Sequence, residues 1–454
     1  MSVDTLRGTV ASLMGRARDD LAELVSFRSV ANADVEPPEE CAKAAEWVID
    51  AFSDAGLGDM TASPTPDGSQ AVHGYAPGPP GSPTVLLYCH YDVQPPLGAD
   101  VWRTPIWELT EVDGRWHGRG TADCKGNIVM HLTALRALRE ENGGFPCSIK
   151  LIAEGSEEQG TGGLEAFVPE NAELLRADAI LVCDTGNFAV GVPTLTTTLR
   201  GMTSVDIRLH ALSSAMHSGM FGGPAPDPVL GLIQLLATLH DEHGNTTVDG
   251  LDATQKWTGV DYPAEQFRVD ANVLDGVSLM GDGTVADLLW ARPSATVLGI
   301  DIPSVASSSA AVQASASARV SLRLPPGVTG AAAQDALVDH LRSRVPWRMH
   351  CEIERVAVGD PFVGTLSGPA FEAMKSAMED AFKHPMTTEG QGGSIPLCNV
   401  FAETFPAAEI MLLGVEEPKC LIHAPNESVD PGEIEKTALA EALFLSRYAA
   451  SRGQ

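Results

Sequence analysis

Three stretches decide the fold of this chain: TVLLYCH at residues 84–90, CSIKLIAEG at 147–155 and DAILVCD at 178–184. Each is mostly apolar and contains β-branched residues, which is typical of strands buried on both faces of a sheet. KGNIVMHLTALRALREE (125–141) lies between the first two and repeats apolar residues at helical spacing. Strands that alternate with helices predict an α/β fold with a largely parallel sheet.

A different pattern begins near Pro193. In TLTTTLRGMTSVDIRLH (194–210) and SASARVSLRL (315–324) polar and apolar residues alternate, as in strands with one exposed face. Helices are expected near residues 228–240 and 331–344. The segment therefore predicts a small α+β domain.

The first pattern resumes after Pro361 and ends in a long helix expected at about residues 432–451. A core domain made of residues 1–195 and 359–454 would then be discontinuous. The α+β domain of residues 196–358 would be inserted into it.

The chain is strongly acidic. It has 454 residues, of which 30 are Lys or Arg and 60 are Asp or Glu, for a formal charge of −30. Such a surface repels phosphate backbones and anionic lipid, so we expect neither nucleic acid nor a membrane as a partner. Hydrophobic residues make up 44% of the chain, which is typical of a globular protein.

Cysteine usage and the N-terminus predict a cytoplasmic protein. The eight cysteines are scattered, without a CxxC motif or a dense framework, which favours reduced thiols. The first residues lack the apolar core and cleavage site of a signal peptide. No stretch has the uninterrupted apolar length of a membrane span.

Acidic and imidazole residues follow each apolar strand at its carboxyl end. His90 ends the first stretch and Asp92 comes two residues after it, Glu157 and Glu158 follow the second, and Asp184 ends the third. Open α/β sheets place ligands at this edge, so we expect these side chains to lie together. Adjacent carboxylates repel one another unless a cation or a raised pKa relieves the repulsion; a solvated acidic turn is the simpler alternative.

Two further motifs carry candidate ligands. Asp123 lies in GRGTADCKG (118–126), where a helix is expected to begin, and an N-cap aspartate is the alternative. His423 lies in CLIHAPNE (420–427), where a structural histidine is the alternative. Two imidazoles and several carboxylates form a mixed donor set suited to Zn²⁺ or Mn²⁺. Two metals sharing a carboxylate would make a hydrolytic site, with a remaining carboxylate as general base.

The order of these motifs resembles the dinuclear metallopeptidase family that includes carnosinases, cytosolic nonspecific dipeptidases, aminoacylases and glutamate carboxypeptidases. The resemblance runs nearly end to end, includes WRTPIWELTEVDGRWHGRGTADCKG (102–126), and is closest to the dipeptidase branch. It implies a zinc-peptidase-type catalytic domain with a mixed, mostly parallel sheet flanked by helices. The insert would be an α+β lid and dimerisation domain, and the protein a homodimer through that lid.

The resemblance also implies a site with two divalent metal ions per subunit, Zn²⁺ or Mn²⁺. His90 and Asp184 would bind one metal, Glu158 and His423 the second, and Asp123 would bridge them. The bond after Asp123 is often cis in the family. An aspartate at position 184 resembles amino- and dipeptidases, whereas acylases and carboxypeptidases tend to carry glutamate there.

Further residues would act on the substrate. Asp92 would tune His90, Glu157 would be the general base, and His217 would reach into the partner subunit's site to stabilise the oxyanion. The residues expected to grip the substrate's C-terminal carboxylate are Arg323, Gly392, Gly393 and Ser394.

Two departures from the dipeptidase pattern concern substrate recognition. Gly390 and Gln391 stand where Arg-Glu is usual, and Ala310, beside Ser309, replaces an Asn or Thr of the lid. We predict hydrolysis of dipeptides or short peptides with a free carboxylate. The alternatives are an N-acyl amino acid amidohydrolase with the same machinery and a non-catalytic binding protein on this fold, which would have lost site residues.

Overall fold

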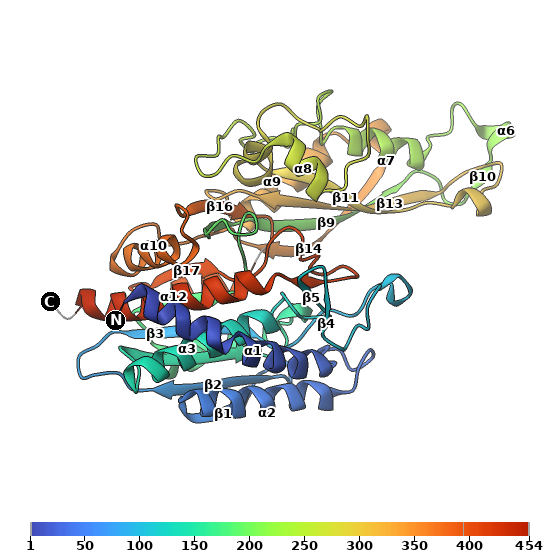
Figure 1. Ribbon diagram of the computed structural model, residues 1–454. Coiled ribbons are helices and arrows are strands. Elements are labelled where there is room, and N and C mark those ends of the chain that lie inside the picture. Colours follow the sequence, from blue (N-terminus) through green and yellow to red (C-terminus); the bar gives the residue numbers. More distant parts are fainter. Residues whose placement is uncertain (1, 394, 453–454) are drawn as a thin grey trace. The chain divides into compact units, whose positions relative to one another are not determined.

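The computed structural model describes residues 2–393 and 395–452 (Figure 1). They form two compact units, and the second is an insertion within the first. The first unit comprises residues 1–197, 364–389 and 397–454, and the second comprises residues 198–363 and 390–396.

A mixed sheet of nine strands organises the first unit. Its order is β1 (Gly58–Pro64), β2 (Gln70–Ala76), β6 (Ser148–Glu154), β3 (Thr84–His90), β7 (Ala179–Cys183), β17 (Glu409–Leu413), β8 (Thr194–Leu199) and β15 (Phe362–Val363), and β16 (Thr387–Gln391) pairs with β8. The middle strands β6, β3, β7 and β17 are parallel, and β2 and β8 join them antiparallel. The predicted mixed, mostly parallel sheet is therefore confirmed.

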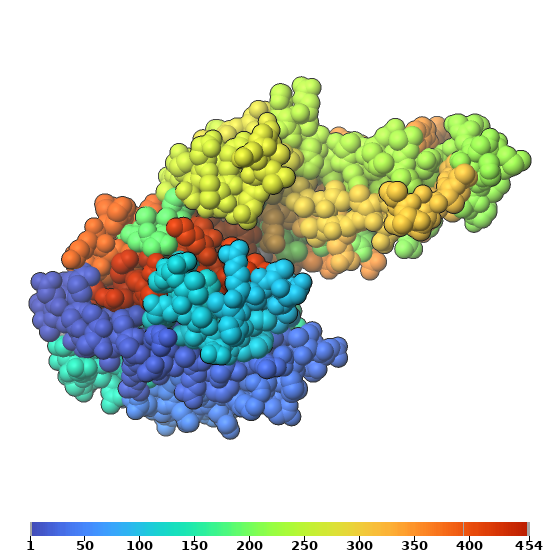
Figure 2. Space-filling view, turned by 45° about the vertical axis from the view of Figure 1, so that its right-hand side comes forward, coloured from blue at the N-terminus to red at the C-terminus, as the bar shows by residue number. Residues whose placement is uncertain are grey.

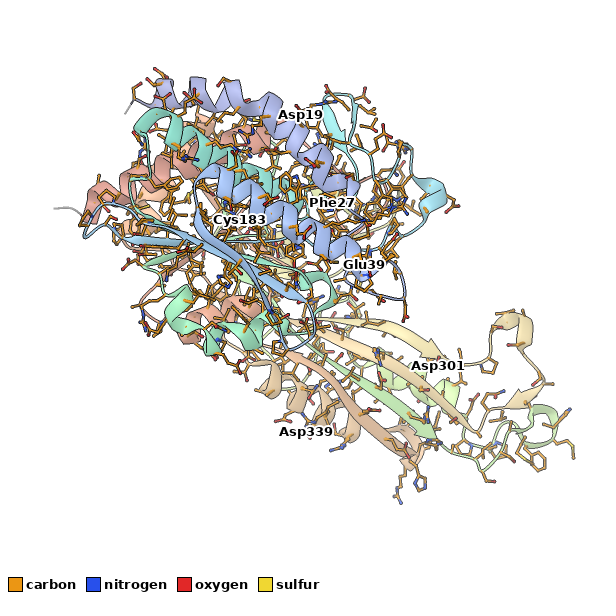
Figure 3. The ribbon with its side chains drawn as sticks, turned by 90° about the horizontal axis from the view of Figure 1, so that it is seen from below. Asp19, Phe27, Glu39, Cys183, Asp301 and Asp339 are labelled. Carbon is orange, nitrogen blue, oxygen red and sulfur yellow. The ribbon has the colours of Figure 1, made fainter. Side chains whose placement is uncertain are left out.

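Helices cover both faces of this sheet. One layer consists of α1 (Val3–Ser26), α2 (Pro38–Ala55), α3 (Lys125–Asn142), α10 (Pro369–Phe382) and α12 (Pro431–Arg452), which pack against one another. Helices α4 (Gly163–Glu170) and α11 (Pro396–Thr404) lie on the other face (Figure 3). Residues 125–138 of α3 are all buried, because this helix lies between the sheet and α1 and α12. Such two-sided covering explains why the middle strands are almost uninterrupted apolar runs.

The second unit is built on an antiparallel sheet of four strands. Its order is β11 (Ser294–Asp301), β13 (Ser315–Leu324), β9 (Gly201–His210) and β14 (His350–Gly359). Helices α7 (Pro228–Ala237) and α9 (Gly330–Ser343) pack on the sheet and bury its inward side chains. Figure 3 labels Asp339 on α9 and Asp301 on the edge strand β11.

A small sheet of two strands lies at one end of the second unit. Strand β10 (Met216–His217) pairs with β12 (Ala311–Val312), and α6 (Ser218–Phe221) follows β10. Figure 2 shows the segments around residues 212–222, in light green, and 302–311, in gold, side by side at this end.

Short elements complete the described chain. They are α5 (Ala172–Leu175), α8 (Ala264–Asp270), the 3-10 helices η1 (Ala99–Val101), η2 (Glu157–Gln159), η4 (Val305–Ser307) and η5 (Pro346–Arg348), the π-helix η3 (Asp287–Ala291), and a small sheet of β4 (Thr110–Val112), β5 (Arg115–His117) and β18 (Ser428–Val429). Among residues 2–393 and 395–452, no helix is long and apolar enough to cross a membrane.

The main elements predicted from the sequence are present, whereas strands β1 and β2 were not predicted. The alternating run 194–210 forms two strands, β8 and β9, with a break at Arg200. The backbone N–H of Arg200 donates to Gln391 O, and its guanidinium donates to Arg323 O over 3.1 Å. These long-range bonds replace the ladder bonds of a continuous strand.

Candidate active site

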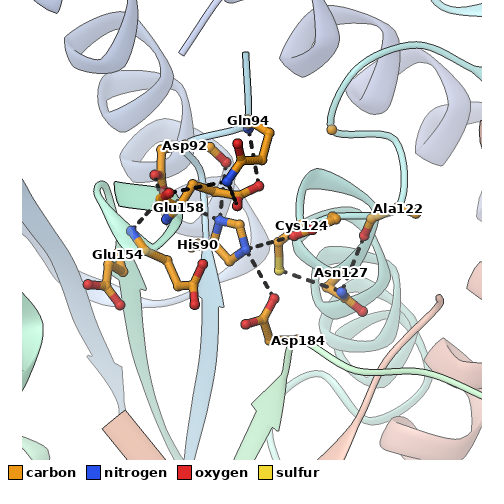
Figure 4. Close-up of polar contacts among 12 residues, drawn as sticks. His90, Asp92, Gln94, Ala122, Cys124, Asn127, Glu154, Glu158 and Asp184 are labelled. Carbon is orange, nitrogen blue, oxygen red and sulfur yellow. Dashed lines mark hydrogen bonds and ion pairs between the residues drawn. The ribbon is translucent and has the colours of Figure 1, made fainter. Parts of the chain in front are cut away.

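The predicted acidic and imidazole residues of the first unit meet at the carboxyl edge of its sheet (Figure 4). His90 is the last residue of β3, and Asp184 directly follows β7. Glu158 lies in η2 after β6, and Asp123 precedes α3. His423 comes from the loop between β17 and β18. Parallel strands end at one edge, so residues far apart in sequence come together there.

The two carboxylate oxygens of Asp123 face two different imidazoles. Asp123 Oδ1 lies 3.0 Å from His90 Nε2, and Asp123 Oδ2 lies 3.0 Å from His423 Nε2. His90 Nε2 is also 3.0 Å from Asp184 Oδ1, and His423 Nε2 is 3.1 Å from Glu158 Oε2. Asp123 therefore stands between two groups of donors, the arrangement required of a bridging ligand.

Glu427 fixes the turn that carries Asp123. Its buried carboxylate accepts hydrogen bonds from the backbone N–H groups of Gly120, Ala122 and Asp123, at 2.9, 3.0 and 3.2 Å. Arg119 forms an ion pair with the same carboxylate over 2.7 Å. Gly120 has a φ of +82°, and a Cβ there would lie 2.6 Å from the side chain of Val93, so the turn requires glycine. The peptide bond after Asp123 is cis.

Asp92 and Gln94 fix the turn that carries Glu157 and Glu158. The buried carboxylate of Asp92 accepts hydrogen bonds from the backbone N–H groups of both glutamates, each over 3.1 Å. Gln94 Nε2 donates to Glu158 Oε2 over 2.8 Å. Asp92 Oδ1 also lies 3.3 Å from His90 Nδ1, and Asp92 O lies 3.1 Å from the same nitrogen. Asp92 thus links the orientation of His90 to that of the acidic turn.

The site crowds carboxylates in a place from which water is largely excluded. Burial and then the charge of Asp184 raise the pKa of Glu157 to about 10, and burial and then Asp123 raise the pKa of Glu158 to about 7. Hydrogen bonds to Asp123 and Glu158 raise the pKa of His423 to about 11. Protons bound to these groups supply positive charge that would otherwise have to come from a cation.

A pair of divalent metals fits this donor set. Among the described residues, four groups place one ligand atom of each member within 4.8 Å of the others. Two of them correspond to the two metal positions: His90 with Cys124 and Asp184, and Asp123 with Glu158 and His423. Ligands of tetrahedral Zn²⁺ lie at roughly 2.0–2.2 Å from the metal, and hence about 3.3–3.6 Å from one another. The donor separations of 3.0–3.1 Å approach that spacing. Imidazole with carboxylate suits Zn²⁺ and Mn²⁺.

His217 lies in the second unit, on the short strand β10, and is exposed. Its Nδ1 accepts a hydrogen bond from the backbone N–H of Gly219 over 3.1 Å. In a neutral ring the proton is then on Nε2, which makes this nitrogen a hydrogen-bond donor.

Arg323, Gly392 and Gly393 also belong to the second unit, whereas Ser394 lies outside the described residues. Arg323 is half-buried on β13. Arg200 joins the two segments, because its backbone N–H donates to Gln391 O and its side chain donates to Arg323 O. The guanidinium of Arg200 therefore lies against the backbone of Arg323, the residue predicted to bind the substrate's carboxylate.

Sequence reasoning missed three residues around these groups: Arg200, Glu416 and Glu427. Glu427 was visible in the motif around His423, but its three backbone bonds were not. Glu416 places a carboxylate oxygen within 4.8 Å of oxygens of Asp123 and Asp184. It follows β17, another parallel strand, so the strand-end rule could have found it.

A family model described as peptidase family M20/M25/M40 matches residues 86–447. The chain belongs to this family. The M20 chain is 43% identical over 437 residues to a cysteinylglycine-S-conjugate dipeptidase of Corynebacterium striatum, covering 95% of both proteins. It is 27% identical over 387 residues to a human Beta-Ala-His dipeptidase, covering 81% of this chain and 75% of that protein.

Solved structures agree in fold. The di-peptidase Dug1p of Saccharomyces cerevisiae superposes with a TM-score of 0.81 at 22% identity, covering 99% of both chains. A dinuclear metal-binding M20 peptidase of Bacillus subtilis superposes with a TM-score of 0.60 at 12% identity, covering 96% of this chain and 98% of that one. The predicted family and its dipeptidase branch are confirmed.

Proposed function

We propose that this M20 peptidase hydrolyses the peptide bond of dipeptides at a dinuclear metal site. The observation that carries the proposal is the position of Asp123, whose two oxygens face His90 and His423. His90, Asp123 and Asp184 would hold one Zn²⁺ or Mn²⁺. Asp123, Glu158 and His423 would hold the other. Bound metals supply a polarised carbonyl and a water of lowered pKa.

Glu157 is the proposed general base. It shares η2 with the proposed ligand Glu158 but makes no side-chain hydrogen bond that would occupy it among the described residues. Asp92 holds the backbone of both glutamates, so Glu157 is kept at a set position beside the donors. It would take a proton from the attacking water and deliver it to the leaving amine.

Residues of the second unit have proposed roles in binding the substrate and its oxyanion. Arg323 and the loop of Gly392, Gly393 and Ser394 would bind the C-terminal carboxylate, because a guanidinium matches it with two parallel hydrogen bonds. His217 Nε2, whose proton follows from the bond to Gly219, would donate to the oxyanion in the partner subunit's site.

A homodimer through the second unit is part of this proposal. Strand β11 is an edge strand with exposed apolar side chains; Leu298 is 59% exposed and Ile300 is 47% exposed. Such an edge offers unpaired backbone groups to a second strand, and natural proteins usually protect it. A second copy of this chain would cover it.

The proposed substrates are unblocked dipeptides, including cysteinylglycine and its S-conjugates, the substrate class in the name of the Corynebacterium relative. Asp184 supports a free amino terminus. We also propose a cytoplasmic location, because all eight cysteines are free thiols.

A substrate panel tests the function. Metal-loaded protein is mixed with free dipeptides, among them Cys-Gly and S-methyl-Cys-Gly, and with their N-acetylated and C-terminally amidated forms. Cleavage of the free dipeptides alone supports a dipeptidase that needs the C-terminal carboxylate. Cleavage of the acetylated forms alone establishes an N-acyl amino acid amidohydrolase and overturns the proposal. If the amidated dipeptides are cleaved as fast as the free ones, the enzyme does not need the C-terminal carboxylate, and the proposed carboxylate-binding role of Arg323 and the Gly392–Ser394 loop is wrong.

A further inference from the structure

Glu416 is held firmly beside the proposed metal centre. It lies three residues after β17, and its backbone O accepts a hydrogen bond from Asn187 N over 2.8 Å. Glu416 also forms a parallel bridge with Gly186. A Cβ at Gly186 would lie 2.0 Å from Glu416 O, so this close approach requires glycine. These contacts fix the backbone of Glu416.

The carboxylate of Glu416 is buried without a protein partner. The residue is 7% exposed, and Glu416 Oε1 has no hydrogen-bond partner among the residues that the structure describes. The nearby acidic groups are Asp123 and Asp184, each with an oxygen within 4.8 Å. Buried carboxylates in proteins are normally paired with a cation, hydrogen-bonded or bound to a metal.

Two buried cations of the first unit already have other partners. Arg119 pairs with Glu427, and the buried Lys125 donates to the backbone oxygens of Leu24 and Phe27, each over 2.8 Å. The next residue, Glu417, is also buried but forms an ion pair with Arg115. Of these two adjacent glutamates, Glu417 forms an ion pair with an arginine, whereas Glu416 forms none and its Oε1 has no hydrogen-bond partner among the described residues.

We propose that Glu416 is a further carboxylate ligand of the metal on the Asp184 side of the centre. This inference rests on the dinuclear site proposed above. His90, Asp123, Asp184 and Glu416 would then supply one nitrogen and three carboxylates, whereas the other metal has Asp123, Glu158 and His423. Carboxylate oxygens favour hard cations such as Mn²⁺, so the two positions are unequal.

Metal titration of the full chain tests the inference. Protein stripped with a chelator is titrated with Mn²⁺ alone, and binding is followed by calorimetry and by the electron paramagnetic resonance of free Mn²⁺. Wild type should bind two ions. Glu416→Gln should bind one of them at least about tenfold more weakly, the range found when residues supporting a metal site are removed. The matched control Glu417→Gln should still bind two ions as wild type does.

Thermal unfolding separates this role from a structural one. Without metal, Glu416→Gln should be at least as stable as wild type, because a buried unpaired charge is removed. With saturating Mn²⁺ it should gain less stability than wild type does. Glu416→Met, of similar size and without oxygen donors, should repeat both results.

Three outcomes would overturn the inference. Wild-type affinity for both ions in Glu416→Gln removes Glu416 from the metal site. Equal loss of stability with and without metal in both variants assigns it a structural role. If wild type itself binds no pair of metals, the dinuclear site fails as well, and the two failures are thereby distinguished.

Discussion

The hydroxyl of Ser156 donates a hydrogen bond to the carboxylate of Asp67 over 2.7 Å. Thr161 donates to the same oxygen of Asp67, so the two hydroxyls lie on either side of η2, which carries Glu157 and Glu158. A Cβ at Gly163 would lie 2.4 Å from the Asp67 carboxylate, so α4 needs glycine at its start. Asp67 thus binds the hydroxyls of the residues that flank the acidic turn, while Asp92 binds the backbone N–H groups of the turn itself.

Asp67→Asn should lower kcat by about tenfold with little change in KM, because the anchor sets the position of Glu157 and does not touch the substrate. Ser156→Ala should have a smaller effect in the same direction. In the double variant the losses should be less than additive, since both changes remove one contact. Steady-state kinetics at saturating metal measures this.

Asp19→Asn is the matched control, because Asp19 is exposed on α1 (Figure 3) and should leave kcat unchanged. Fully additive losses in the double variant would show that Asp67 does not act through Ser156.

Glu157→Gln should lower kcat by about 10²–10⁴-fold, the usual contribution of a general base. Both metals should remain, because the proposed ligands are other residues. Metal analysis of the dialysed protein and kinetics on a free dipeptide measure the two properties. A variant with both metals and full activity would rule out Glu157 as the base.

His217→Ala should lose turnover with its metal content intact, since the residue lies on strand β10 of the second unit and not among the donors. Mixed with Glu157→Ala, it should regain part of the activity. Hybrid dimers would then contain one site with both residues intact. Native mass spectrometry would establish that subunits have exchanged, and exchange without recovered activity contradicts sharing across an interface.

Glu389 should make stability depend on pH. Burial on β16 raises the pKa of Glu389 to about 8, above that of an unfolded glutamate, so the folded state keeps a proton that the unfolded state has lost. Stability therefore falls as pH rises from about 4.5 to about 8. Glu389→Gln removes this pH dependence. The difference between its free energy of unfolding and that of wild type should therefore grow by up to about 1.4 kcal/mol per pH unit in that window.

Urea unfolding of both proteins at pH 5, 6.5 and 8, in the same metal state, measures the difference. Glu403→Gln, at an exposed position on α11, is the control, and its free energy of unfolding should change with pH as that of wild type does. A constant gap between Glu389→Gln and wild type would show that Glu389 titrates normally.

The sheet could be predicted from residues 84–90, 147–155 and 178–184 because a strand covered on both faces must be apolar throughout. The antiparallel strands β1 and β2, at one end of the sheet, were not predicted. Half of β1 faces solvent, and its residues include Gly, Asp and Pro, which lower strand propensity. The break at Arg200 also depends on partners far away in sequence.

By itself the sequence determined the central strands, the helix after Asp123 and the residue types at each strand end, because these follow from local apolar periodicity and from the edge at which parallel strands end. Only the tertiary structure decided which of them meet. Glu427 reaches the turn of Asp123 across 304 residues, and Asp67 reaches Ser156 across 89. A carboxylate's partners depend on which distant backbone and hydroxyl groups packing brings within about 3 Å, and no local pattern encodes that.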